Sequence, residues 1–198
     1  MGLLSNTNSF SCFYASPQDH GTDLYLWLKE RVFQFSFRDE VEGLSKKVGW
    51  ASIVDPYSPE IAEESMFVGD FLVLSMRVEE RRVPKALVKK YCAIEEEKIK
   101  RSKDLKRLSR REKKRIREQV EFLLLQKVLP IPSVYDMAWD LNGEIVYFFS
   151  TSSKVIGDFQ DFFHKSFDIM PSPIIPYNLA MTRFGTDSVK GLSPEVFV

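Results

Sequence analysis

The sequence predicts an α+β protein, arranged as two small sheet-and-helix units with a projecting basic helical hairpin between them. Apolar stretches of strand-like composition lie on both sides of residues 84–128, whereas a helical period fills 84–128 itself. The pair Asn142-Gly143 stands between two apolar runs, which is the strongest short signal for a β-hairpin. Strand and helix patterns mixed in this order are typical of the α+β class.

Four parts follow from these patterns. We expect an N-terminal α+β unit at 1–83, the basic helical hairpin at 84–128, a ββαβ unit at 129–180 and a loosely ordered tail at 181–198. Apolar periodicity fades from Thr182, which is why the tail is set apart. With 198 residues, 44% of them hydrophobic, the chain is long enough to bury a core.

The first part contains three predicted strands and one helix. Residues 9–15 alternate loosely as a strand, and 24–32 have the spacing of a short amphipathic helix with Asp23 in its first turn. Residues 48–54 and 67–78 are the next strands. Gly69, inside the last of these stretches, is either a hairpin turn or a bulge.

Two helices are predicted within the hairpin. Pro84 suits the first turn of the first helix, because its missing N–H would have no partner there. Ser109 and Glu112 have the spacing of a capping box at the start of the second helix. Pro130 and Pro132 follow its end. The residues with the spacing of buried stripes are Leu87, Tyr91 and Ile94 in the first helix and Ile116, Val120, Leu123 and Leu124 in the second.

The third part has strands at 134–141 and 144–149, a helix capped by Ser152 or Ser153, and an edge strand at Ile174-Ile175. Four phenylalanines recur along the helix at the spacing of a core stripe: Phe159, Phe162, Phe163 and Phe167. Stacking of these rings on nucleic-acid bases is the alternative use for them.

Positive charge is concentrated in one segment of a neutral chain. Residues 81–117 hold seventeen Lys or Arg and five acidic residues, a net charge of about +12, whereas the whole chain has 28 of each sign. Such helix faces are often plain solvated surface. Nearly single-signed stretches at 98–106 and 110–117 repel themselves, however, unless an anionic partner is close. Both explanations are compatible with the sequence.

No catalytic motif accompanies this charge. The sequence has no phosphate-binding loop, dinucleotide fingerprint, zinc-protease helix or nucleophile elbow. Cys12 and Cys92 are expected to be free buried thiols, and His20 and His164 lie in different elements. No signal peptide and no membrane span is expected. The acids that could hold a metal for a nuclease are Asp136, Asp140 and Glu144 around the hairpin and Asp158 and Asp161 on the last helix.

Several segments, in order and spacing, resemble the N-terminal part of the bacterial RdgC family of recombination-associated proteins, some of which are labelled exonucleases. The resemblance covers residues 3–180 and is carried by Gly49-Trp50, Phe71-Leu-Val-Leu-Ser-Met-Arg-Val-Glu-Glu, Val83-Pro84, Arg117-Glu-Gln-Val-Glu-Phe-Leu-Leu, Met137-Ala-Trp-Asp-Leu-Asn-Gly and Ile174-Ile-Pro-Tyr.

This resemblance implies a ring-shaped homodimer with a basic inner surface, which binds double-stranded DNA with little sequence preference and restrains a recombinase. The chain departs from the family pattern after the second basic helix. The family has Leu-Leu-Pro-Arg-Ala-Phe there, and this chain has Leu123-Leu-Leu-Gln-Lys-Val-Leu-Pro-Ile-Pro. The later portion of longer members, which contributes to ring closure and DNA contact, has no counterpart in these 198 residues.

The sequence therefore predicts a non-enzymatic, sequence-nonspecific double-stranded DNA-binding protein, linked to recombination, cytoplasmic, nucleoid-associated and homodimeric, with no cofactor, metal or catalytic residue. The expected phosphate contacts are Lys85, Lys89, Lys100, Arg101, Lys103, Lys106, Arg107, Arg110, Arg111, Lys113, Lys114 and Arg117. Arg77, Arg81 and Arg82 are candidate additions. A module that docks an acidic partner through the basic hairpin is the alternative, and a metal-dependent exonuclease is the third hypothesis.

Overall fold

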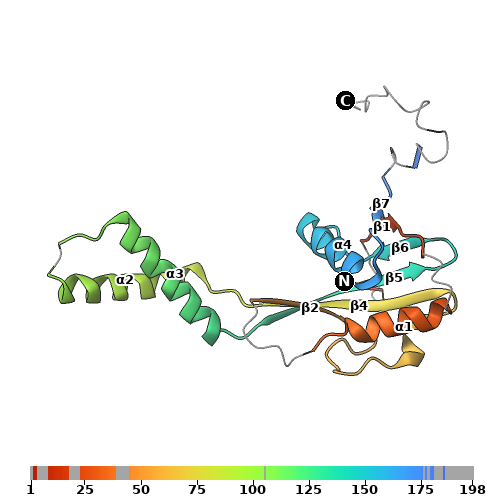
Figure 1. Ribbon diagram of the computed structural model, residues 1–198, viewed down its shortest axis with the longest axis horizontal. Helices are drawn as coiled ribbons and strands as arrows, with labels where there is room; N and C mark the ends of the chain where they lie inside the picture. Colours follow the sequence, from red (N-terminus) through yellow and green to blue (C-terminus); the bar gives the residue numbers. More distant parts are fainter. Residues whose placement is uncertain are drawn as a thin grey trace. The chain divides into compact units, whose positions relative to one another are not determined.

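The computed structural model describes residues 2–3, 9–17, 23–38, 45–104, 106–175, 177, 179–180 and 185 (Figure 1). The strands are β1 (Ser11–Tyr14), β2 (Lys46–Ala51), β3 (Phe67–Val68), β4 (Phe71–Glu80), β5 (Ile131–Asp140), β6 (Ile145–Phe148) and β7 (Ser172–Pro173). The helices are α1 (Leu24–Gln34), the 3₁₀ turn η1 (Glu63–Ser65), α2 (Lys85–Ser102), α3 (Arg110–Lys127) and α4 (Ser153–Phe167).

The chain divides into two compact units. The first, which we call the sheet unit, comprises Met1–Phe37, Gly49–Arg77 and Val134–Val198. The second, the hairpin unit, comprises Arg38–Val48 and Val78–Ser133 and therefore contains α2 and α3. Each unit is built from segments that lie far apart in the sequence.

The described strands form one sheet in the order β2-β4-β5-β6-β1-β7, with β3 paired to β4. The pairs β1–β6, β1–β7, β3–β4 and β5–β6 are antiparallel. The predicted α+β class is confirmed. Its arrangement differs from the prediction, because strands expected in two separate units share this sheet. The pairing of β1 with β6 joins them, and a local periodicity identifies a strand without identifying its partner.

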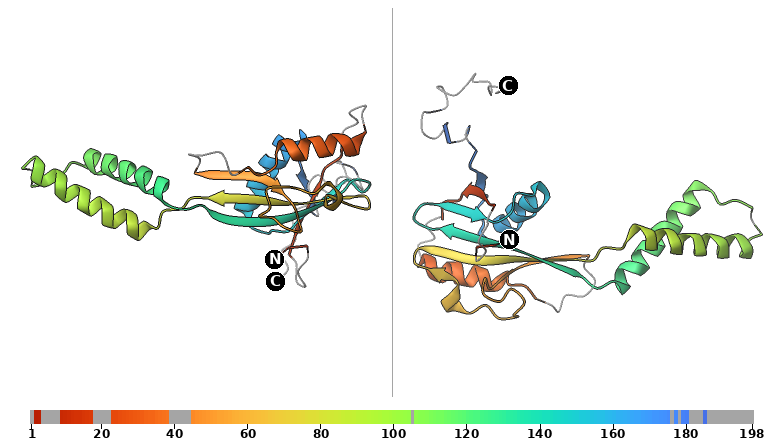
Figure 2. Two further views of the ribbon diagram at one scale, coloured as in Figure 1. Left: turned by 90° about the horizontal axis from the view of Figure 1, so that it is seen from below. Right: turned by 180° about the vertical axis from the view of Figure 1, so that it is seen from behind.

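One face of the sheet unit is covered by α1 and α4, which lie on the same side of the strands (Figure 2). The predicted phenylalanine stripe of α4 is a core stripe, since all four rings are buried. Phe159 stacks on Phe148 of β6 at a centroid distance of 4.0 Å, and Phe163 meets Trp139 of β5 at 5.0 Å. Base stacking by this stripe is therefore ruled out.

The indole N–H groups of the buried tryptophans have partners. Trp139 Nε1 donates to the Ala15 carbonyl at 3.0 Å, and Trp50 Nε1 donates to Ser166 Oγ at 3.0 Å. The Ser166 hydroxyl in turn donates to the Phe162 carbonyl. Because an unpaired buried donor would cost free energy, these bonds allow large indole rings to fill the core.

Both predicted turns are present. Gly69, at φ 59°, belongs to the hairpin turn between β3 and β4. Of the two alternatives expected for this glycine, the hairpin turn is therefore confirmed and the bulge is wrong. The Asn142-Gly143 hairpin also forms, but the positive φ (57°) falls on Glu144 instead of on the pair. The Asp140 carboxylate accepts the backbone N–H of Asn142 and of Gly143, which fixes the turn. A Cβ at Gly143 would lie 2.5 Å from Asp140 Oδ2, so a larger residue there would displace the carboxylate that holds the turn.

Three further expectations are corrected. The edge strand is β7, which precedes the predicted Ile174-Ile175, although the Ile174 N–H still donates to the Cys12 carbonyl. Asp23 is the N-cap of α1 rather than a residue of its first turn, and its side chain accepts from the Tyr25 N–H. The α4 N-cap is Ser152, but its side chain makes no capping bond. The predicted tail, 181–198, lies outside the described residues except for Gly185.

Candidate nucleic-acid interface

The basic hairpin is held together by a small apolar core. Val88 of α2 and Ile116, Val120 and Leu124 of α3 are buried together with Leu108 of the connection. Leu87, Cys92 and Ile99 pack against them and are partly buried. The hairpin is thus a packed pair of helices, and its charged residues are carried on the outside of that core.

The predicted stripes are wrong at three positions. Tyr91, Ile94 and Leu123 are exposed, whereas Val88, one residue after Leu87, faces the partner helix. On α2 the set Val88, Cys92 and Ile99 has a helical spacing as regular as the predicted one, so periodicity alone could not choose between two adjacent faces.

The capping box at the start of α3 is confirmed. Ser109 Oγ accepts from the Glu112 N–H at 3.2 Å, and the Glu112 carboxylate accepts from the Ser109 N–H at 3.0 Å. The pKa of Glu112 is lowered mainly by the hydrogen bond that its carboxylate accepts from the Ser109 backbone. The hydrogen bond from the Ser109 hydroxyl is the second cause. Glu112 also lies 3.8 Å from Lys103 Nζ, so the cap joins the two helices electrostatically.

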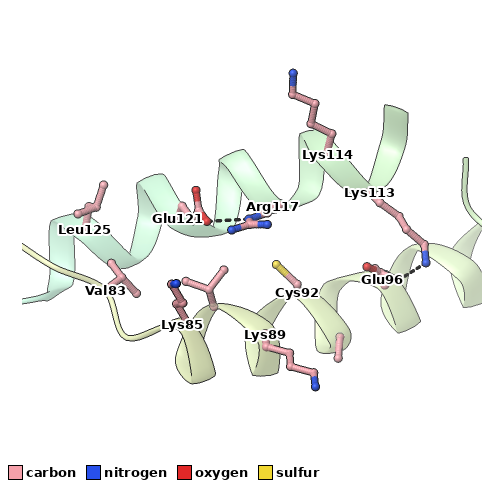
Figure 3. A pocket seen from close by; sticks show the side chains of 12 residues that line it. Val83, Lys85, Lys89, Cys92, Glu96, Lys113, Lys114, Arg117, Glu121 and Leu125 are labelled. Atoms are coloured by element: carbon pink, nitrogen blue, oxygen red, sulfur yellow. Dashed lines mark hydrogen bonds and ion pairs between the residues drawn. The ribbon is translucent and has the colours of Figure 1, made fainter. Parts of the chain in front are cut away.

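A groove of about 920 Å³ runs between α2 and α3, and basic residues of both helices line it (Figure 3). We call it the cationic groove. Its walls include Val83, Val88, Ala93 and Leu125. Five of the twelve predicted phosphate-binding residues line it: Lys85, Lys89, Lys113, Lys114 and Arg117. Residues separated by 24 or more positions are brought together here by the hairpin.

Acidic residues inside the groove partly neutralise this charge. Arg117 Nε donates to Glu121 at 2.8 Å, and Lys113 Nζ lies 3.6 Å from Glu96 (Figure 3). Lys85 and Lys89 have no ion-pair partner among the described residues. Five cations against two carboxylates leave the groove with a net charge of +3. It therefore favours an anion. Three of its cations already hold one carboxylate each, since Lys114 also lies 3.8 Å from Glu118, which is not part of the groove lining.

Sequence reasoning missed Glu96 and Glu121 as members of the site. The Arg117–Glu121 pair has the i,i+4 spacing that predicts a helical ion pair, and Lys114–Glu118 at 3.8 Å is another of the same kind. Glu118 and Glu121 lie beyond the basic segment at 81–117, whereas Glu96 lies within it and belongs to its five acidic residues. The Lys113–Glu96 pair joins two helices, so no spacing in the sequence could have revealed it.

The other seven predicted contacts are not brought into this groove. They lie toward the connected ends of the helices and in the connection itself: Lys100, Arg101, Lys103, Lys106, Arg107, Arg110 and Arg111. Arg101 lies 3.5 Å from Glu97, and Lys103 pairs with Glu112. Arg110 and Arg111 have no ion-pair partner in the described chain. All seven except the half-buried Lys100 are exposed, and we call this set the basic end.

Of the three candidate additions, Arg77 is unsuited to a phosphate. Its side chain is buried, with the guanidinium 4.1 Å from the Phe37 ring centroid and 5.5 Å from that of Tyr57. It stabilises the sheet unit through cation–π contact. Arg82 is exposed and donates to Glu80 at 2.6 Å and 2.9 Å, and the Arg81 N–H donates to the Ser45 carbonyl.

The three acids proposed around the β5–β6 hairpin are committed to other partners, and the other two, Asp158 and Asp161, lie on α4. Asp136 accepts from Ser75 Oγ at 2.7 Å and from the Leu3 N–H at 2.8 Å, and Asp140 caps its own turn. Glu144 accepts from the hydroxyls of Tyr14 and Ser16. In the described part of the chain, no three His, Cys, Asp or Glu side chains are placed to share a metal ion.

The remaining candidates for chemistry are isolated. Cys12 and Cys92 are free, as predicted, but half-buried instead of buried. Cys92 and Arg117 point toward one another between the helices (Figure 3). Burial raises the pKa of the Cys92 thiol, and Glu96 raises it further. His164 is an exposed residue in the last turn of α4, and His20 lies outside the described residues. None of the described helices combines the length and apolar character needed to cross a membrane.

Comparison with known proteins identifies the family. A family model described as "Putative exonuclease, RdgC" matches residues 13–187, which include all of the hairpin. A search of curated proteins returns no match. The matched segment covers most of the 198 residues and extends through every described element from α1 to β7. The chain therefore belongs to the RdgC family.

Proposed function

We propose that this protein binds double-stranded DNA without sequence preference, through phosphate contacts made by the α2–α3 hairpin, in the context of DNA recombination. The observation that carries the proposal is the cationic groove, which five Lys or Arg residues from two helices line. Arg117 and Lys113 lie between the helices, whereas Lys89 and Lys114 extend outward from the groove (Figure 3). Cations spread over two helices in this way can follow a phosphate backbone, and such contacts position a protein without reading base edges. Membership of the RdgC family, which is linked in general to DNA binding and recombination, supports it.

The groove and the basic end have different roles in this proposal. Lys85 and Lys89 are available at once, whereas Arg117, Lys113 and Lys114 first have to leave Glu121, Glu96 and Glu118 respectively. Exposed ion pairs contribute only about 0–1 kcal/mol, so a phosphate can replace the carboxylate at little cost. The seven basic residues toward the connection then add further contacts along the duplex.

A matched pair of double variants tests this assignment. Lys85→Glu with Lys89→Glu reverses two charges inside the groove, and Lys90→Glu with Lys127→Glu reverses two exposed charges of the same helices outside it. Net charge changes equally in both. We expect the groove variant to bind duplex DNA more weakly than the control variant, with a salt slope reduced by about 1.8, equivalent to two phosphate contacts.

The measurement is fluorescence anisotropy of a labelled duplex at several salt concentrations, with circular dichroism to verify the fold of both variants. Equal affinities for the two variants would contradict the groove assignment, because only net charge would then matter. Unchanged affinity in both would contradict the role of the hairpin altogether.

We further propose that the protein acts by binding and not by cleavage. The family is described as an exonuclease, so this has to be tested directly. With Mg²⁺ or Mn²⁺ present, labelled duplex and single-stranded DNA should remain intact, since the acids around the β5–β6 turn have structural partners. Degradation that is lost in Asp136→Asn or Asp140→Asn would establish the exonuclease instead.

A homodimer is part of the same proposal, because the RdgC resemblance implies a ring with a basic inner surface. Two hairpins on one duplex would double the number of phosphate contacts available to a single chain. Sedimentation velocity of the intact chain should give a dimer. A monomer at all concentrations would remove the ring from the proposal and leave the groove unaffected.

A further inference from the structure

The hairpin has a second groove on a different side from the cationic one. Its volume is about 390 Å³, and it shares no lining residue with the cationic groove. The lining residues are Glu95, Ile99, Ile116, Gln119, Val120, Phe122 and Leu123. Phe122 and Leu123 are 62% and 55% exposed. Large apolar side chains grouped in this way are typical of interaction sites.

The apolar surface continues along α2. Tyr91 precedes Glu95 by one helical turn, and Ile94 is adjacent to Glu95; both are exposed. We call Tyr91, Ile94, Phe122 and Leu123, with the groove between them, the apolar strip. Two helices packed side by side present a furrow into which the ridge of a third helix fits. The strip therefore suits a helix better than an extended segment.

Positive charge at one end of the strip indicates which kind of partner the strip would bind. Arg115 precedes Gln119 by one turn of α3, and Arg111 precedes Arg115 by another, so both continue the same side of the helix. Both are exposed, and within the described chain neither has an ion-pair partner. A partner that covers the strip meets two uncompensated cations, which favours carboxylates at that position.

We propose that the apolar strip docks an amphipathic acidic helix of another protein. Apolar side chains at i, i+3, i+4 and i+7 of that helix fill the groove beside Phe122 and Leu123, and its carboxylates pair with Arg111 and Arg115. The strip shares no lining residue with the cationic groove, so the proposal does not depend on DNA binding there. Arg111 is common to the basic end and to this site. It gives the hairpin a protein-binding side in addition to its basic side.

The probe is a fluorescent peptide of about 18 residues with Leu at helical spacing and Glu on the opposite face. A scrambled peptide of the same composition and a peptide with Lys in place of Glu are the controls. The intact chain should bind the acidic helix saturably and the scrambled peptide at least tenfold more weakly, by the order of magnitude of an interface anchor. Phe122→Ser with Leu123→Ser should lose about tenfold in affinity while keeping its melting temperature, because both side chains are exposed.

A second double variant tests the contribution of charge to peptide binding separately from that of apolar contact. Arg111→Glu with Arg115→Glu should weaken binding of the acidic helix and strengthen binding of the Lys peptide. The proposal is overturned if the parent fails to bind the acidic helix, if the scrambled peptide binds equally, or if the Phe122 and Leu123 variant binds as the parent does. Sedimentation of that variant completes the test. A loss of self-association there would make the strip a contact between copies and would likewise overturn the proposal.

Discussion

At the scale of single residues, Glu144 joins the start of β6 to the end of the neighbouring strand β1. It has a positive φ of 57° just before β6, and its carboxylate accepts hydrogen bonds from Tyr14 at the end of β1 and from Ser16. The Ala15 N–H donates to the Glu144 carbonyl, so backbone and side chain act together. Non-glycine residues tolerate this backbone region when the surrounding contacts define it, as they do here.

The first prediction concerns the pH dependence of this contact. The Ser16 bond, followed by the Tyr14 bond, lowers the pKa of Glu144, and the bond to Glu144 raises the pKa of Tyr14. A lowered carboxyl pKa stabilises the fold above its unfolded value of about 4.3, and this stabilisation is lost as pH falls through the folded value. A raised tyrosine pKa stabilises below about pH 10, and that contribution is lost as pH rises.

Melting temperature against pH is the measurement. In Glu144→Gln the decline below about pH 4.3 should be shallower than in the parent, and in Tyr14→Phe the decline above about pH 10 should be shallower. Glu60→Gln is the control, because Glu60 is exposed and lies far from this contact in the sequence. A parent-like acid decline in Glu144→Gln would show that the contact does not contribute to stability.

At the scale of elements, the α2–α3 hairpin shows what a sequence can predict and where it fails. The capping box depends on neighbours within four residues, so it was predicted from spacing. Pro84 does mark the start of α2, but as the N-cap residue instead of the predicted residue of the first turn. Which face of α2 is buried depends on which of its sides packs against α3. Val88 and Leu87 are adjacent and equally apolar, and only the packing of α2 on α3 distinguishes them. Glu96 was missed as a groove residue for the same reason, whereas the Arg117–Glu121 pair has a local i,i+4 spacing that the sequence does show.

This difference between faces predicts a difference in stability. Ile116→Ala removes a buried side chain from the hairpin core and should cost about 2–5 kcal/mol. Leu123→Ala removes an exposed side chain of the same helix and should change stability by about 0.5 kcal/mol or less. Thermal and denaturant melts followed by circular dichroism would measure both. Similar losses in the two variants would contradict the packing of α3 described above.

At the scale of the whole molecule, the overall composition does not show that positive charge is concentrated in the hairpin. The chain is neutral, yet the helical hairpin from Lys85 to Lys127 has sixteen basic and seven acidic residues, a net charge of +9. This asymmetry was evident in the sequence. The single sheet was not, because β1 pairs with a strand more than 130 residues away, and no local pattern encodes that distance.

The most direct test of DNA binding through phosphates is the salt dependence of the parent protein's affinity for duplexes of unrelated sequence. If the five groove cations each neutralise one phosphate, log affinity should fall linearly with log salt concentration with a slope of about −4.5, and all duplexes should bind alike. Additional contacts from the basic end would make the slope steeper. A salt-independent affinity, strong preference for one sequence, or no binding at low salt would contradict the account.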